Sequence, residues 1–176
     1  MRRVIGASTG IGSTRQELRD IGRPWAAGRR LSNSGDAEFV NVIPPGEYMS
    51  RYVFFTDPTY PETDLVIVRV KGPNGFEDVT LDCAGKLGGW QPLGSSGGYE
   101  YTRVDLVRHD FAPQGNCDNG RHDISSNRPF GLTVWGWGSA ETGAQFKGFY
   151  SQYVSYAYPG GARVAPINDV VIQIPK

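Results

Sequence analysis

His122 is the residue of this chain best suited to general acid–base chemistry, and it lies in a segment with other reactive groups. His122-Asp123 is followed by Ser125 and Ser126, so a base, a carboxylate and two hydroxyls occur close together. Neither serine lies in the Gly-x-Ser-x-Gly turn that exposes the nucleophile of α/β-hydrolases. We therefore interpret the segment as a strand end whose side chains bond to turn amides. A secreted hydrolase using His122 with a nearby Ser or Asp is kept as the alternative function.

Cys83 and Cys117 are the only two cysteines of the chain. Zinc sites usually have several ligands at close spacing, whereas these cysteines lie far apart with only His109 and His122 near Cys117, so we predict no metal site. A catalytic cysteine is also disfavoured, because residues 118–120 (Asp-Asn-Gly) after Cys117 are typical of a turn. We predict a disulfide instead, which would stabilise the fold by roughly 3–4 kcal/mol in the loop-entropy model. A disulfide indicates an oxidising compartment.

Carboxylates that could bind calcium are dispersed along the chain, without the spacing of an EF-hand loop. They are Asp57, Asp64, Asp78, Asp82, Asp105 and Asp110. We therefore predict no cofactor, and a calcium ion bound between loops remains an open alternative.

A glycine-rich segment at residues 6–12 is similar to the cofactor-binding turn of short-chain dehydrogenases, in which a strand leads into a helix that binds a pyrophosphate. Only four residues follow Met1 before Gly6, too few for a buried central strand, and no alternation of strands and helices follows. The Tyr-x-x-x-Lys pair of that family is absent, since Val154 and Ala157 follow Tyr150 and Tyr153 at the lysine position. We therefore reject a dehydrogenase and interpret the segment as a flexible Gly/Ser stretch.

Aromatic residues are concentrated in the last third of the chain. Trp135 and Trp137 are two positions apart, so they lie on the same face of a strand. Together with a run of tyrosines they are candidates for an exposed contact surface, while packing in the core is the alternative. The candidate binding residues are Trp135, Trp137, Tyr150, Tyr153, Tyr156 and Tyr158.

The elements that would position these residues are strands. Gly at 24 and Pro at 12 together make up about a fifth of the 176 residues, which is typical of many strands joined by turns. Residues 72–75 (Gly-Pro-Asn-Gly) predict a hairpin that pairs residues 76–82 with the strand before them. The predicted fold is an antiparallel, jelly-roll-like β-sandwich. Its predicted strands are residues 48–55, 64–71, 76–82, 99–107, 129–137, 150–158 and 169–174.

Charge and hydropathy limit the partners. Lysine and arginine balance aspartate and glutamate at 18 each, so no basic excess favours nucleic acid. No apolar run reaches the length of about 20 residues that a spanning helix needs.

Residues 1–35 form an irregular arm with a short helix at 13–20, interpreted as the remnant of a longer domain, and residues 36–176 form the β-sandwich. The first residues lack the apolar stretch of a signal peptide, which we expect upstream of this chain.

A series of segments resembles a known family when taken in order. The segments are residues 52–60, 64–68, 79–83, 99–106, 120–126, 129–137 and 155–161. Over residues 39–165 this series resembles the C-terminal half of the IgGFc-binding protein N-terminal domain family. The resemblance implies a binding or adhesion domain of a larger secreted protein. It supplies no catalytic residues, and it does not imply that this chain binds antibody.

The expected function is therefore an extracellular or cell-surface binding module without enzymatic activity. Its expected partners are a cell-surface glycan or protein and other domains of the same polypeptide. The binding energy would come from stiff amphipathic rings, which anchor a partner at low entropic cost.

Overall fold

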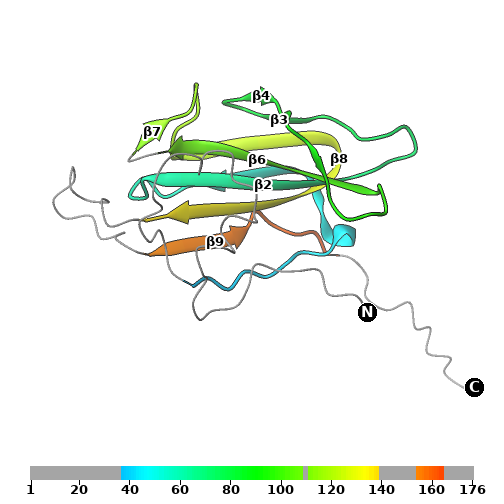
Figure 1. Ribbon diagram of the computed structural model, residues 1–176, viewed down its shortest axis with the longest axis horizontal. Coiled ribbons are helices and arrows are strands. Elements are labelled where there is room, and N and C mark those ends of the chain that lie inside the picture. The colour runs from blue at the N-terminus through cyan, green and yellow to red at the C-terminus, as the bar shows by residue number, and fades with distance from the viewer. Residues whose placement is uncertain (1–36, 109–110, 139–153, 165–176) are drawn as a thin grey trace, which may run out of the picture.

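The computed structural model describes residues 37–108, 111–138 and 154–164, which form an all-β fold (Figure 1). Helix in these residues is limited to one short 3₁₀ turn, η2 (Pro45–Glu47). The strands are β1 (Met49–Phe55), β2 (Glu62–Val70), β3 (Val79–Leu81), β4 (Gly85–Lys86), β5 (Gln91–Pro92), β6 (Tyr99–Arg108), β7 (Ala112–Pro113), β8 (Arg121–Trp137) and β9 (Ser155–Pro159). Their pairings are all antiparallel, as the sequence predicted.

The long strand β8 organises the sheet. Its first part, residues 121–126, lies between β1 and β3, and its second part, residues 130–137, lies between β9 and β2. β4 continues the sheet beyond β3, while β6 continues it beyond β2 and pairs in turn with β5 and β7. Each half of the sheet is therefore built on a different part of one strand.

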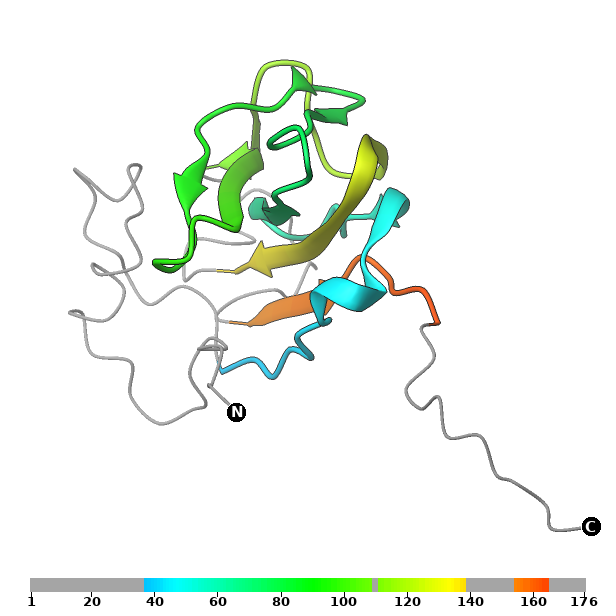
Figure 2. The same ribbon diagram turned by 90° about the vertical axis from the view of Figure 1, so that its right-hand side faces the viewer.

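The core lies on one face of the sheet. Along β8, even-numbered residues are buried at both ends, from His122 and Ile124 to Leu132 and Val134, because alternate side chains point to one face. Strands of both halves contribute to a single apolar cluster, which includes Tyr52, Phe54, Leu65, Ile67, Val79, Leu81, Leu106, Ile124, Phe130, Leu132 and Val134. The sheet thus curls around its own core, as Figure 2 shows. The two layers of the predicted sandwich are halves of one continuous sheet.

The predicted pairing of residues 76–82 with the preceding strand is wrong. The turn forms, with Gly72 and Gly75 bridged to each other, but β3 pairs with β8 and β4. Both edges of β2 are taken by longer strands, β6 and β8. The Arg69 guanidinium donates to the carbonyl of Glu77 and lies over the Phe76 ring, which ties this segment to β2.

Other strand predictions agree with the structure in part. The predicted strands at 48–55, 64–71 and 99–107 correspond to β1, β2 and β6, and residues 129–137 form the second part of a longer β8. Only the end of the predicted strand at 150–158 is described, as β9. The predicted arm and helix in residues 1–35 and the predicted strand at 169–174 lie outside the described residues.

Candidate functional site

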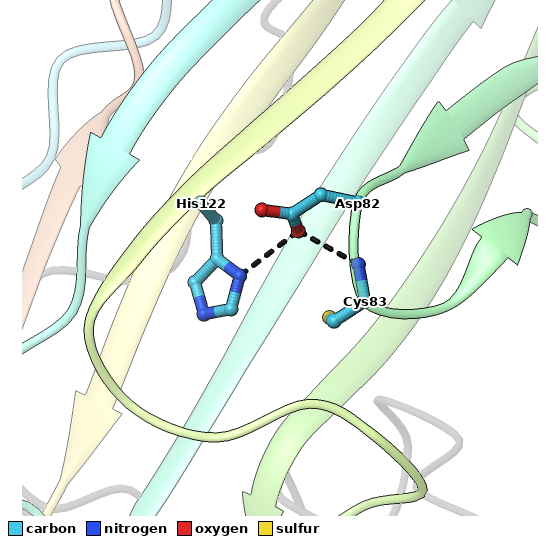
Figure 3. Close-up of side chains that lie close together, drawn as sticks. All are labelled: Asp82, Cys83 and His122. Carbon is cyan, nitrogen blue, oxygen red and sulfur yellow. Dashed lines mark hydrogen bonds and ion pairs between the residues drawn. The ribbon is translucent and has the colours of Figure 1, made fainter.

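His122 has a carboxylate partner, but it is Asp82 rather than the neighbouring Asp123. Nδ1 of His122 lies 3.0 Å from Oδ1 of Asp82, at the end of β3 (Figure 3). Asp123 points to the opposite face of β8, where its carboxylate binds Arg51. Hydrogen bonding to that guanidinium lowers the pKa of Asp123. Residues adjacent in the sequence are therefore separated by the sheet, and the histidine meets a carboxylate 40 positions away.

Both ring nitrogens of His122 are occupied. Nε2 lies 2.8 Å from the carbonyl oxygen of Asp118, and the residue is only 6% exposed. In a hydrolytic triad this nitrogen would accept the proton of a nucleophile, whereas here it faces a carbonyl, to which it can only donate. Ser125 lies on the outer face of β8, and the Ser126 hydroxyl accepts from the Arg128 amide. The described contacts of His122 thus form a dyad without a serine on Nε2.

The Asp82 carboxylate is held in place by backbone amides. Its Oδ1 accepts the N–H of Cys83 at 2.8 Å, and its Oδ2 accepts the N–H of Asp123 at 3.0 Å. These bonds fix the carboxylate between the turn after β3 and the start of β8. The ring of His122 packs against the Phe54 ring, with 5.5 Å between the ring centroids.

Cys83 and Cys117 form a disulfide beside this dyad, as predicted. Their Cα atoms are 4.9 Å apart. Cys117, in the loop before β8, is 1% exposed and belongs to the core, whereas Cys83 is partly exposed in the turn after β3. The bond joins two loops that the sheet brings to the same end.

The cluster of potential metal ligands here was missed by the sequence analysis. Asp82, Cys83 and His122 each offer one ligand atom, and these atoms all lie within 4.8 Å of one another. The sequence signal was weak because the residues come from three separate segments. With the disulfide formed, the sulfur of Cys83 is no thiolate and does not serve as a metal ligand.

The predicted tryptophans lie together on the outer face of the second half of the sheet. Trp135 and Trp137 alternate with the buried Val134 and stack on each other, with ring centroids 5.1 Å apart and planes 3° apart. The indole N–H of Trp137 donates to Oδ1 of Asp64 at 2.6 Å on the adjacent strand β2. This bond holds one ring of the stack, and both tryptophans remain partly exposed.

Tyr156 and Tyr158 lie on the other face of the sheet and pack against the core. The hydroxyl of Tyr156 accepts the N–H of Asp57 at 3.1 Å, and that of Tyr158 donates to the carbonyl of Phe55. Burial raises the pKa of Tyr156 to about 12. The structure therefore separates these two tyrosines from the tryptophans. Tyr150 and Tyr153 lie outside the described residues.

Comparison with protein-family models confirms the family resemblance seen in the sequence. Residues 24–136 match the model of the family described as IgGFc binding protein. The chain belongs to this family. The IgGFc-binding match includes β1 to β7 and almost all of β8, and so contains the disulfide, the His122–Asp82 dyad and Trp135. No curated protein and no solved structure matches the chain.

A domain of the IgGFc-binding family is a binding-type domain of a larger protein. In the part of this member that the structure describes, no helix has the length and hydropathy of a membrane span.

Proposed function

We propose that this chain is a non-catalytic, extracellular protein-binding module of a larger secreted protein. The observation that carries the proposal is the stacked pair Trp135 and Trp137 on the outer face of the sheet, in a member of a binding family. The disulfide supports an oxidising, extracellular location. The proposed function requires no cofactor.

The outer face around the tryptophans has the composition of a contact surface. Across β2 and β6 it presents partly exposed apolar and aromatic side chains: Val66, Val68, Tyr99 and Tyr101. Arg103, on the same face, has its Nε buried without a hydrogen-bond partner among the described residues. Tryptophan, tyrosine and arginine are the residues most enriched at the energetic centres of protein interfaces. Tyr150 and Tyr153 stay candidate contact residues, while Tyr156 and Tyr158 would support β9 from the other face.

The partner proposed is an extracellular protein, and the family's description makes immunoglobulin G Fc the first one to test. Glycan binding is the competing outcome, because exposed indole rings also suit sugars. The test is equilibrium binding of the purified chain to arrays of extracellular proteins, Fc included, and of glycans. Trp135→Ala should weaken binding to a protein at least tenfold. Binding to glycans only, or to a protein without any effect of Trp135→Ala, would contradict the proposal.

Phe55→Ala is the matched control for this experiment. Phe55 is an aromatic residue 64% exposed on the outer face of β1, in the other half of the sheet. Its substitution should leave binding unchanged and the fold intact. If Phe55→Ala weakened binding while Trp135→Ala did not, the contact surface would lie on the half of the sheet that contains β1, which would contradict the proposal.

A secreted hydrolase is the second candidate function, because His122 does bond to a carboxylate as a catalytic histidine would. Hydrolysis of ester, amide or glycoside substrates by the wild-type chain, lost in His122→Ala, would favour it. The occupied Nε2 of His122 favours the binding function instead.

A further inference from the structure

Four residues at the disulfide carry the donor atoms that zinc prefers. One ligand atom each of Asp82, Cys83 and His122 lies within 4.8 Å of the others, and Cys117 is bonded to Cys83. Two thiolates, an imidazole nitrogen and a carboxylate oxygen are common ligands of tetrahedral Zn²⁺. We propose that reduction of the Cys83–Cys117 disulfide converts this cluster into a zinc-binding site.

The oxygen and nitrogen ligands are already positioned. Oδ1 of Asp82 and Nδ1 of His122 are 3.0 Å apart, close to the separation of about 3.3 Å between two such ligands on a tetrahedral zinc ion. Two backbone amides hold the carboxylate, and burial holds the ring. Binding zinc therefore requires little rearrangement of either side chain (Figure 3).

The hydrogen bond to Asp118 favours Nδ1 of His122 as the ligand atom. Nε2 faces a carbonyl oxygen at 2.8 Å, so it carries a proton and donates. Nδ1 shares a hydrogen bond with Oδ1 of Asp82, and zinc would replace and release the proton of that bond, so that the lone pair of Nδ1 binds the metal. Histidine ligands of metals usually donate their other N–H to a carbonyl or carboxylate in this way.

The sulfur ligands arise by thiol–disulfide exchange. A dithiol reductant transfers two electrons and two protons, so the S–S bond breaks, both cysteines become thiols and the reductant leaves as a cyclic disulfide. Zinc then displaces both thiol protons. The two sulfurs must separate to about 3.8 Å, the distance set by two Zn–S bonds of about 2.3 Å. Cys83 lies in the turn between β3 and β4, and Cys117 lies in the loop between β7 and β8, where its backbone is bridged to Gln114.

The direct test uses the full chain, reduced under metal-free conditions, with Co²⁺ as a spectroscopic probe. The reduced chain should show the absorption of tetrahedral Co²⁺ with a thiolate-to-cobalt charge-transfer band, and Zn²⁺ should abolish it. Zinc should also raise the Tm of the reduced chain and leave that of the oxidised chain unchanged. Equal zinc affinity of the oxidised and reduced chains, or no tetrahedral spectrum, would overturn the proposal.

Variants identify the ligands. Asp82→Asn and His122→Gln should each weaken zinc binding by the reduced chain about tenfold or more. Asp123→Asn is the control, because the Asp123 carboxylate pairs with Arg51, and this variant should bind zinc as the wild-type chain does. Circular dichroism of each reduced variant with zinc checks that it is folded. Unchanged zinc affinity in both ligand variants would show that the cysteines bind metal without this dyad, contrary to the proposal.

Discussion

The ring of Tyr156 covers Gly136 across the β8–β9 pair. The two residues are direct partners in the register, and a Cβ at Gly136 would lie 2.6 Å from Cζ of Tyr156. Gly136→Ala should therefore destabilise the fold by roughly 1–3 kcal/mol, because the ring has to move. Chemical denaturation measures the change. The double variant with Tyr156→Ala should show strong non-additivity, since the overlap is then removed.

Gly88→Ala is the control for that substitution. A Cβ at Gly88 meets nothing within 4 Å, and its backbone needs no left-handed conformation. The expected change in unfolding free energy is within about 0.5 kcal/mol. Similar effects at the two glycines would refute the steric explanation.

Tyr52 ties β1 to β8 through its hydroxyl. The group donates to the carbonyl of Phe130 and accepts the amide of Met49 at 2.9 Å, in a side chain that is 2% exposed. Tyr52→Phe should cost roughly 1–3 kcal/mol, because a buried carbonyl and a partly buried amide lose their hydrogen-bond partner. Tyr101→Phe, on the outer face, should change stability little. Thermal unfolding of both variants tests this, and equal Tm values would contradict it.

Alkaline pH should destabilise the fold through Tyr48 and Tyr156. Burial raises the pKa of both residues from 10.0 to about 12. The hydroxyl of each tyrosine therefore keeps its proton more tightly in the folded chain than in the unfolded chain. The contribution of these protonated hydroxyls to folding stability is complete below pH 10 and is lost as the pH rises towards 12. Absorbance titration of tyrosinate should find these two groups ionising late. Ionisation of every tyrosine near the ordinary value, in chain shown to be folded, would contradict the burial.

The disulfide should contribute substantially to stability. Replacing Cys83 and Cys117 together by serine should cost roughly 3–4 kcal/mol, because the bond closes a loop of 34 positions in the unfolded chain. Equilibrium unfolding in denaturant without reductant compares the double variant with the wild-type chain. A change below 1 kcal/mol would show that the bond adds little to the fold.

Local patterns in the sequence predicted individual strands, but they did not predict the contacts between segments far apart in the sequence. Alternation of apolar residues was sufficient for β1, β2 and β6, and the isolated cysteine pair was sufficient for the disulfide. The predicted pairing partner of β3 was wrong, because a turn sequence does not reveal that both edges of β2 are paired with β6 and β8.

The candidate site shows the same limit. Adjacent residues His122 and Asp123 looked like one grouping, but alternation along a strand sends them to opposite faces. Their separation by one position could have predicted this. The bond of His122 to Asp82 depends on the pairing of β3 with β8, which no local pattern encodes.

Equilibrium binding of the Trp135→Ala variant to an extracellular protein partner tests the central claim most directly. The account predicts saturable binding of the wild-type chain to an arrayed extracellular protein, at least tenfold weaker binding by Trp135→Ala and normal binding by Phe55→Ala. The mass of the bound partner should be unchanged after incubation with the chain. Turnover of a substrate that depends on His122, with no effect of Trp135→Ala on binding, would contradict it.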